Sequence, residues 1–393
     1  MKKLSLILLI IVGINCQKVV EKVNTETFKL ELTSSTNEGK LPLVPNKKIK
    51  NVIFLIGDGT GLAQITSGQY AIVGSDGYLN LQRMPITGIS RTRSANNLVT
   101  DSAAGATAYS CGEKTDNYMI GYLPDGSHCK TILEIANEMG LSTGLVATST
   151  ITHATPASFA AHVKHRKMED VIAEQYLDAD VDVLLGGGLE FFIPQTEEGS
   201  SRKDDRNLVD EFSALGYDFV DNAQDLEANT SDKLLGLFAL QGIDSKNRTP
   251  SLTQMTDRAL DVLNKNEKGF FLMVEGSQID WGGHANDVEY VIREMRDFDD
   301  AVKSVLDFAV QDGETLVVFT ADHETGGMTM QKSKLESTEM EIYWTTGSHT
   351  GIPVVTMAYG PHAIEFSGWQ ENTDVGRKIA QLMGMKNFPA IIE

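Results

Sequence analysis

Seven acidic and imidazole side chains stand beside short apolar segments of this chain and could bind divalent cations. They are Asp58, Glu275, Asp280, His284, Asp322, His323 and His349. Nitrogen and oxygen ligands without a thiolate are typical of catalytic zinc, and an oxygen-only position suits magnesium. A single aspartate of this kind is commonly a helix cap or turn residue, and a single histidine is commonly a hydrogen-bonded residue without a metal. The repetition of the same placement along the chain favours one shared metal centre.

Ser102 is the candidate nucleophile. It follows Asp101 and opens a segment of small residues, 103–108, that we expect to be helical. The N-terminus of a helix offers free N–H groups and the positive end of the helix dipole, both favourable to an anion. The structural alternative is an ordinary cap on an alanine-rich helix. Because the chain has no G-x-S-x-G motif, activation of Ser102 by a metal ion is favoured over a hydrolase triad.

Arg166 is the candidate anion clamp. It lies in the basic run His162-Val163-Lys164-His165-Arg166-Lys167. A planar guanidinium matches two oxygens of a phosphate group, although a basic run is also typical of a solvated helix face.

Apolar segments alternate with helix-like segments from residue 51 onward. The apolar segments are nearly continuous, at 52–56, 144–148, 181–185, 270–274, 316–320 and 353–358. Such runs are typical of strands buried on both faces of a parallel sheet. Between them we expect helices at 102–109, 131–139, 252–264 and 287–310. The alternation predicts an α/β fold, a three-layer sandwich with a largely parallel central sheet.

In such a sheet, ligands bind beyond the carboxyl ends of the strands. Most of the candidate ligands follow an apolar segment, so we expect them to converge at one edge of the sheet. We expect residues 49–393 to form a single domain, in which the polar and weakly periodic stretch 192–247 is surface elaboration.

The composition restricts the function classes. With 41% hydrophobic and 22% charged residues among 393, the chain resembles ordinary globular proteins, which excludes wholesale disorder. The formal net charge of −20 disfavours nucleic acid as a partner, so an anionic substrate would need a locally positive site. Three cysteines exclude a four-cysteine zinc cluster. Cys111 and Cys129 could form a disulfide in an oxidising compartment or remain buried thiols, and the sequence leaves both open.

The N-terminus has the pattern of an export signal. Lys2 and Lys3 precede the apolar run 4–12, which is too short to span a bilayer, and Cys16 follows. Residues 1–15 resemble a lipoprotein signal peptide, with Cys16 as the lipidated residue, although Asn15 is atypical before the cleavage point. Plain secretion and an apolar helix of a cytosolic protein are the alternatives. We expect 16–48 to be a flexible tether, and the protein to lie in the periplasm or cell envelope, touching the membrane only through the lipid.

Several motifs, taken together and in order, resemble the alkaline phosphatase family over roughly residues 48–385. They are Gly57-Asp58-Gly59-Thr60-Gly61, Asp101-Ser102-Ala103-Ala104, His153-Ala154-Thr155-Pro156, Val274-Glu275-Gly276, Ile279-Asp280 with His284, Thr320-Ala321-Asp322-His323, and Gly347-Ser348-His349-Thr350-Gly351. A single motif would be weak, but the ordered set is specific. The resemblance implies an alkaline-phosphatase-like fold and hydrolysis of phosphate monoesters.

By motif position, the resemblance implies a centre with two zinc ions and one magnesium ion. The ligands of one zinc would be Asp280, His284 and His349. Those of the other would be Asp58, Asp322 and His323. Asp58 would also bridge to the magnesium, which Thr155 and Glu275 complete.

The resemblance implies that Ser102 attacks phosphorus and forms a phosphoserine intermediate. Arg166 would clamp the phosphate, and Asp101 would orient Arg166. The carboxylates leave the pocket negative without cations, whereas the three cations would make it positive, so metals would be needed for phosphate binding as well as for chemistry.

Two positions vary between branches of the family. His153 stands where some members have Asp, and Trp281 stands where some have Lys, both around the magnesium and its phosphate-linked waters. Only 25 residues lie between His323 and His349, where other members carry a large crown insertion. The family implies a homodimer.

Three rival functions differ in the residues that they require. A phosphodiesterase or nucleotide pyrophosphatase on the same scaffold typically uses a threonine nucleophile and lacks the carboxylate at Glu275. A sulfatase would need a Cys/Ser-x-Pro-x-Arg motif, which neither Cys111 nor Cys129 provides. A non-catalytic lipoprotein that binds metal or phosphate would not need Ser102 and Arg166 in addition to the ligands.

Overall fold

Strand β2 (Asn51–Gly57) is buried along its whole length and separates two hydrophobic cores. Ile53 and Leu55 point into one core, whereas Val52, Phe54 and Ile56 point into the other. Successive side chains of a strand point to opposite faces, so a continuous apolar run serves both cores at once. The computed structural model describes residues 24–30, 39–331, 334 and 339–392.

The central sheet has ten strands. In spatial order they are β16 (Gly368–Glu371), β3 (Ile86–Arg91), β15 (Val354–Tyr359), β10 (Thr315–Thr320), β2, β9 (Phe270–Gly276), β5 (Ser142–Thr150), β6 (Val183–Gly187), β8 (Leu234–Leu237) and β7 (Asp218–Val220). Only β15 runs antiparallel to its neighbours β10 and β3. The sheet is therefore largely parallel, and each of the six predicted strands is confirmed within a few residues.

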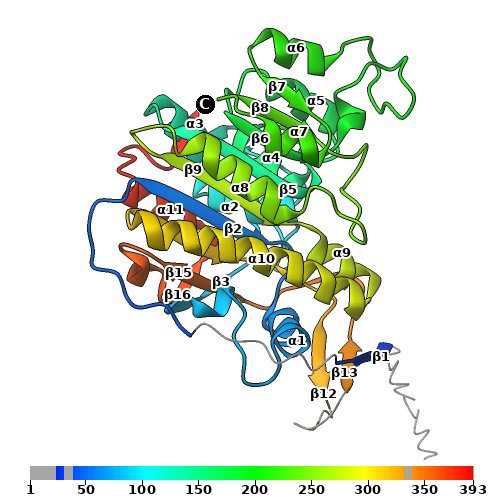
Figure 1. The fold of residues 1–393 in the computed structure, drawn as a ribbon, viewed down its shortest axis with the longest axis vertical. Helices are drawn as coiled ribbons and strands as arrows, with labels where there is room; N and C mark the ends of the chain where they lie inside the picture. Colours follow the sequence, from blue (N-terminus) through cyan, green and yellow to red (C-terminus); the bar gives the residue numbers. More distant parts are fainter. Residues whose placement is uncertain (1–23, 31–38, 332–333, 335–338, 393) are drawn as a thin grey trace, which may run out of the picture.

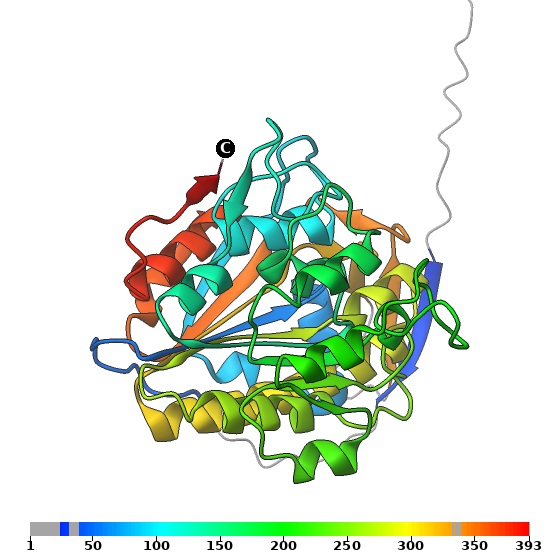
Figure 2. The same cartoon turned by 90° about the horizontal axis from the view of Figure 1, so that it is seen from above.

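Helices cover both faces of the sheet and make three layers (Figures 1 and 2). One core lies under α1 (Leu62–Ile72), α7 (Ala223–Ala228), α8 (Leu252–Leu263) and α10 (Val288–Asp312). The other lies under α2 (Ser102–Cys111), α3 (Ile132–Glu138), α4 (Ala154–Ala160), α5 (Glu169–Gln175), α6 (Leu208–Ala214) and α11 (Asn372–Leu382). The four predicted helices correspond to α2, α3, α8 and α10. None of the helices among the described residues combines the length and apolar character needed to cross a bilayer.

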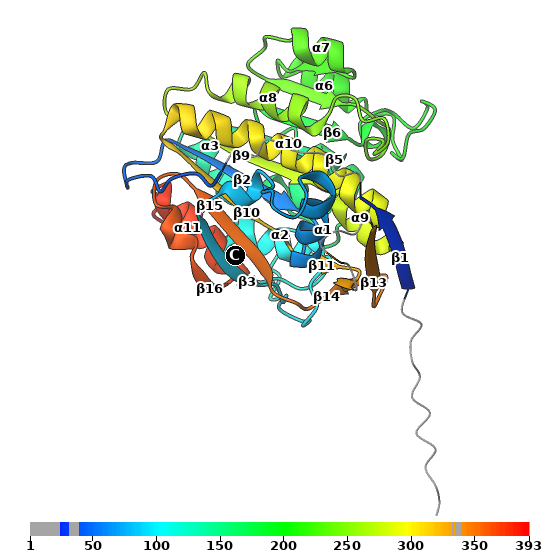
Figure 3. The ribbon, with the colours of Figure 1, turned by 60° about the horizontal axis from the view of Figure 1, so that its bottom comes forward.

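Outside the central sheet, the described residues form three small sheets. β1 (Asn24–Lys29), β13 (Glu339–Trp344) and β12 (Met328–Gln331) form one, β11 (Glu324–Thr325) and β14 (His349–Thr350) the second, and β17 (Ala390–Ile392) and β4 (His128–Lys130) the third. Figure 3 shows β1 beside β13, at the end of the molecule where α9 (Gln278–Ala285) lies. Cys111 at the end of α2 is disulfide-bonded to Cys129 in β4, which decides a question that the sequence left open.

Two expectations about domain organisation need correction. The stretch 16–48 is not a tether throughout, because β1 pairs antiparallel with β13 over six residues and Leu41 donates its N–H to the Arg83 carbonyl. The stretch 192–247 is not only surface elaboration, because β8 and β7 extend the central sheet and Leu234 and Leu235 are fully buried. Short strands of three to four residues carry too little periodicity to be recognised. The expected signal peptide and Cys16 lie outside the described residues.

The packing of α11 against α2 depends on a glycine. A Cβ atom at Gly376 would overlap the carbonyl oxygen of Tyr109 in α2. We expect Gly376→Ala to force these helices apart and to lower the free energy of unfolding by about 1–3 kcal/mol, as overpacking does. Gly39→Ala is the matched control, because a Cβ there meets nothing within 4 Å. Urea unfolding of both variants measures the difference, and equal stabilities would contradict this account of the packing.

Candidate active site

Three adjacent strands bring the candidate ligands to one edge of the sheet. Asp58 follows β2, Glu275 lies near the end of β9, and Asp322 follows β10. β2 pairs parallel with both neighbours, with Ile56 opposite Glu275 on one side and Thr320 on the other. Parallel strands in this register end at the same level, so side chains far apart in the sequence meet there. The expected convergence is confirmed for the described chain.

The first group contains Asp280, His284 and His349. Asp280 and His284 are one helical turn apart in α9, with His284 Nε2 3.3 Å from Asp280 Oδ2. His349 in β14 approaches them from the other side, with its Nε2 3.1 Å from His284 Nε2 and 3.6 Å from Asp280 Oδ1. The arrangement brings two nitrogen donors and one carboxylate to a common point.

The second group contains Asp58, Asp322 and His323, all fully buried. His323 Nε2 lies 3.2 Å from Asp322 Oδ2 and 3.6 Å from Asp58 Oδ1. The same nitrogen lies 3.3 Å from Ser102 Oγ at the start of α2. The hydroxyl predicted to be the nucleophile therefore stands directly at this group of ligands.

The third group joins Asp58 to Glu275 and His153, whose potential ligand atoms lie within 4.8 Å of one another. Glu275 Oε2 accepts a hydrogen bond of 2.7 Å from Ser277, while Oε1 has no hydrogen-bond partner. Thr155 Oγ1 is also buried without a partner, at the first turn of α4. The oxygens of Asp58, Glu275 and Thr155 are those that the family resemblance assigns to magnesium.

Arg166 and Asp101 are held as expected. Arg166 Nη1 donates to Asp101 Oδ2 at 3.0 Å, and Asp101 Oδ1 accepts from the N–H groups of Ala104 and Tyr118. Asp101 thus caps α2 and orients the guanidinium at the same time. Arg166 does not lie in a regular helix but in the segment between α4 and α5, so the solvated-helix alternative is wrong.

His153 contacts the other side of the Arg166 guanidinium. Arg166 Nη2 lies 2.9 Å from His153 Nε2. Since arginine only donates, Nε2 must accept, and the neutral ring then carries its proton on Nδ1. Nδ1 is buried without a hydrogen-bond partner, and with its proton it can only donate, so His153 serves better as a donor than as a metal ligand. The Trp281 ring packs edge-on against His153, with ring centroids 6.3 Å apart.

The imidazoles are turned so that Nε2 faces the site. His284 Nδ1 lies 2.9 Å from the Gly347 carbonyl oxygen, and His349 Nδ1 lies 2.9 Å from the Thr100 carbonyl oxygen. A carbonyl only accepts, so in each ring Nδ1 carries the proton and Nε2 presents its lone pair. If both rings are neutral, two lone pairs face each other across 3.1 Å, which is favourable only with a metal ion or a proton between them.

The electrostatics of the buried carboxylates also require positive charge. Burial raises the pKa of Asp58 well above its ordinary value, and the carboxylates of Asp322 and Asp280 raise it further. Burial likewise raises the pKa of Glu275 to about 8 and that of Asp322 to about 6. Without cations Glu275 would hold a proton at neutral pH, because its pKa lies above 7.

The histidines respond according to their surroundings. Burial, followed by the charge of Arg166, lowers the pKa of His153 to about 3. Burial also lowers the pKa of His323 well below its ordinary value. The hydrogen bond that His284 donates to the Asp280 carboxylate raises the pKa of His284 to about 9. For Asp280, burial raises the pKa, but the hydrogen bond with His284 and the nearby imidazoles outweigh burial and lower it.

Divalent cations fit this set of donors. The buried oxygens without a hydrogen-bond partner include both of Asp58, one of Glu275, one of Asp322 and the hydroxyl of Thr155. Buried polar atoms are rarely left without a partner, and each such atom costs about 1–3 kcal/mol. Their concentration in two adjoining groups is the pattern expected of ligands shared between neighbouring ions.

Several residues of the site were missed by sequence reasoning. Thr325 donates its hydroxyl to Asp280 Oδ1, and Ser277 donates to Glu275. The carbonyl groups of Thr100 and Gly347 orient His349 and His284. Hydroxyl residues and backbone carbonyls carry no spacing signal of their own, so only their proximity to predicted ligands could have indicated them.

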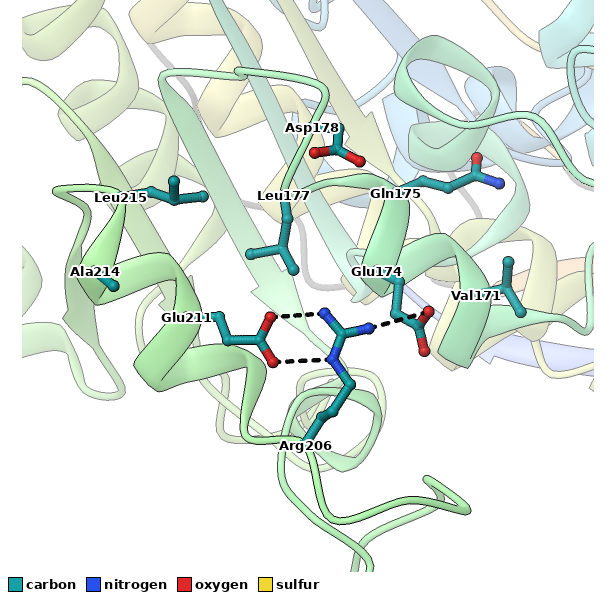
Figure 4. A pocket seen from close by; sticks show the side chains of 9 residues that line it. All are labelled: Val171, Glu174, Gln175, Leu177, Asp178, Arg206, Glu211, Ala214 and Leu215. Carbon is teal, nitrogen blue, oxygen red and sulfur yellow. Dashed lines mark hydrogen bonds and ion pairs between the residues drawn. The ribbon is translucent and has the colours of Figure 1, made fainter.

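A pocket that none of these residues lines lies elsewhere in the described chain. It has a volume of about 520 Å³ and lies between α5 and α6 (Figure 4). The positively charged side chain in this pocket is Arg206. It donates hydrogen bonds to both carboxylate oxygens of Glu211 and forms an ion pair with Glu174. Because Arg206 is neutralised and none of the candidate ligands lines the pocket, we do not assign the chemistry to it.

Known proteins resemble this chain in sequence and in fold. The family model for alkaline phosphatase matches residues 49–341. Alkaline phosphatase 3 of Bacillus subtilis is 39% identical, with 84% of this chain and 88% of the relative covered. The chain belongs to the alkaline phosphatase family. Alkaline phosphatase of Escherichia coli K12 is 34% identical over 87% of both chains.

Solved structures of alkaline phosphatases agree with the fold. The enzyme from the Antarctic bacterium TAB5 superposes with a TM-score of 0.79 at 41% identity, covering 86% of this chain and 99% of that one. The alkaline phosphatase of Thermus thermophilus superposes with a TM-score of 0.80 at 26% identity, covering 90% and 94%. The alkaline-phosphatase-like fold is therefore confirmed, and the chain is an enzyme that hydrolyses phosphate monoesters.

We expect the metal-free alkaline phosphatase to lose stability as the pH rises from about 5 to 8. In the folded state the pKa of Glu275 is raised from 4.5 to about 8. Between these values the folded state keeps a proton that the unfolded state has released, so the free energy of unfolding falls as the pH rises. Urea unfolding in excess chelator across this range measures the slope.

Glu275→Gln removes this titration with little change in shape, so the slope should flatten. The exposed Glu267→Gln is the matched control and should leave the slope unchanged. A slope that Glu275→Gln does not alter would show that another group is responsible.

Proposed function

We propose that this alkaline phosphatase converts phosphate monoesters to an alcohol and inorganic phosphate through a covalent phosphoserine at Ser102, in a centre that holds two zinc ions and one magnesium ion. The observation that carries the proposal is the position of Ser102 Oγ, 3.3 Å from His323 Nε2 and beside the buried carboxylates. Its neighbour Asp101 ties the anion clamp Arg166 to the same helix terminus.

The donors divide between the three cations as follows. Asp280, His284 and His349 would hold one zinc, and Asp58, Asp322 and His323 the other. The oxygens of Asp58, Glu275 and Thr155 suit magnesium, which prefers oxygen ligands. Structures of two variants of the TAB5 enzyme, in which one histidine is replaced by glutamate or aspartate, have Mg bound in a site termed M3. When bound, divalent cations supply Lewis acidity and neutralise charge on the reacting oxygens.

The residues of the chain position and exchange the phosphoryl group. Arg166 presents the remaining N–H groups of its guanidinium to two phosphate oxygens, because Asp101 and His153 hold its plane. Ser102 Oγ attacks phosphorus, loses its proton and forms the ester bond as the alcohol departs. Water then attacks the phosphoserine, which restores Ser102 and releases phosphate. The N-terminus of α2 favours the anionic oxygens throughout.

A monoester is preferred over a diester because three phosphate oxygens without a second substituent can face Arg166 and the cations. The phosphodiesterase alternative is not favoured, since serine occupies the nucleophile position and Glu275 is present. A non-catalytic lipoprotein is not favoured either, because the curated relatives are alkaline phosphatases.

Ser102→Ala tests the covalent route. We expect monoester turnover to fall by about 1000-fold or more, as when other hydrolases lose their nucleophile. Acid quenching of the wild-type enzyme with ³²P-labelled monoester should leave label on the peptide that contains Ser102, and the variant should retain none. Thr107→Ala, in the same helix, is the matched control. Undiminished turnover in Ser102→Ala would contradict the serine mechanism, and rapid diester turnover that resists chelator would contradict the proposed class.

We also propose that the enzyme is exported to the periplasm or cell envelope, anchored by a lipid on Cys16, and works as a homodimer. The support is the signal-like run of residues 4–12 before Cys16, and the dimer implied by the resemblance. Labelled palmitate incorporated by the wild type and lost in Cys16→Ala would support the anchor. Light scattering of the protein lacking residues 1–16 should give twice the monomer mass, and a monomer mass would contradict the dimer.

A further inference from the structure

Glu324 is a buried carboxylate next to the site that none of the proposed roles uses. It directly follows His323, lies in β11 and is only 4% exposed. Among the described residues no cation pairs with it, although burial of a charge is costly unless the charge is well hydrogen-bonded. Its side chain instead accepts four hydrogen bonds, which we take as the clue to its role.

The four donors surround both oxygens of the carboxylate. Oε1 accepts from Gln64 Nε2 at 2.9 Å and from the Met328 N–H at 3.1 Å. Oε2 accepts from the Gly327 N–H at 3.3 Å and from the Thr350 hydroxyl. Hydrogen bonds to a charged group in a buried position are stronger than neutral ones, so this carboxylate holds its donors firmly.

Two of these donors belong to segments that carry proposed metal ligands. Thr350 directly follows His349, and Gln64 lies in α1, which begins just after the turn that contains Asp58. The residues Gln64 and Glu324 are 260 positions apart in the sequence. The carboxylate therefore joins three segments that reach the site from different parts of the fold.

Neighbouring contacts reinforce this junction. Gln64 Oε1 accepts from the Gly61 N–H at 3.1 Å, and a Cβ at Gly61 would overlap the Glu324 side chain. Thr325 pairs with His349 across β11 and β14. A shift of Glu324 would therefore move both the segment of His323 and that of His349.

We propose that Glu324 is a positioning residue that fixes the spacing of the His349 segment, the Asp322–His323 segment and the turn after β2, and so sets the zinc affinity of the site. This rests on the proposed function, because it takes those residues as zinc ligands. Partners that orient metal ligands typically change metal affinity by about 10–100-fold when they are removed.

The test compares zinc retention in Glu324→Gln and Thr350→Val with that in the wild type. An amide at position 324 offers one acceptor oxygen in place of two, and valine at 350 removes one donor while preserving a β-strand residue. We expect zinc affinity, measured by competition with a chromophoric chelator, to fall by about 10–100-fold in Glu324→Gln and in the same direction in Thr350→Val. Added zinc should restore monoester turnover in both variants.

Asp299→Asn is the matched control. Asp299 is also a buried carboxylate; it lies in α10 and accepts from the N–H groups of Asn80 and Leu81, and it contacts none of the proposed ligands through a hydrogen bond. The variant Asp299→Asn should have a lower unfolding temperature but the zinc affinity of the wild type. Should Glu324→Gln fail to fold, Thr350→Val still decides the matter.

The outcomes separate the two proposals. Wild-type zinc affinity in folded Glu324→Gln and Thr350→Val would overturn the role of Glu324 and leave the proposed function intact. A wild-type enzyme that hydrolyses monoesters without binding zinc would overturn the metal assignment, and the role of Glu324 with it. A selective loss of zinc affinity in the two variants, absent in Asp299→Asn, would support the inference.

Discussion

Repulsion between buried acidic side chains is the physical constraint on which the candidate active site depends. Asp58, Glu275 and Asp322 are fully buried, and Asp58 lies close to both of the others. Burial raises the pKa of each, and neighbouring carboxylates, including Asp280, raise it further. Isolated charges of this kind would be expelled from a protein interior. Here three adjacent strands hold the carboxylates together. Their negative charge must therefore be neutralised by bound protons or by metal ions. With divalent cations bound to these carboxylates, a chain with a net charge of −20 would offer a place where a phosphate dianion can bind.

The central sheet can hold these carboxylates close together because both of its faces are covered by packed helices. β10, β2 and β9 are buried along their whole length, and each face packs on its own hydrophobic core. Turns at the strand ends are equally constrained. Gly59 has φ +67°, and a Cβ there would crowd Asp280 and Thr325, so the turn that carries Asp58 requires glycine.

One side chain, Asp101, has two structural roles at the site. Asp101 caps the helix that begins with Ser102 and also holds the guanidinium of Arg166, so the proposed nucleophile and the proposed clamp are positioned by the same side chain. His153 contacts the other side of the Arg166 guanidinium through Nε2 and lies next to Asp58 and Glu275. The chemistry therefore depends on hydrogen bonds between neutral and charged partners as much as on the ligands themselves.

The sequence by itself determined which residue types follow the buried strands, and thus the fold class, the ligand pool, Ser102 and Arg166. Local patterns suffice for this, because continuous apolar runs and ordered motifs are properties of short segments. Only the tertiary structure decided that Cys111 and Cys129 are bonded, that residues 24–29 pair with β13, and that β7 and β8 extend the sheet. It alone also revealed Glu324 and the carbonyl groups that orient His284 and His349. Such contacts join segments up to hundreds of residues apart, and their energy depends on burial and direction, which no local spacing encodes.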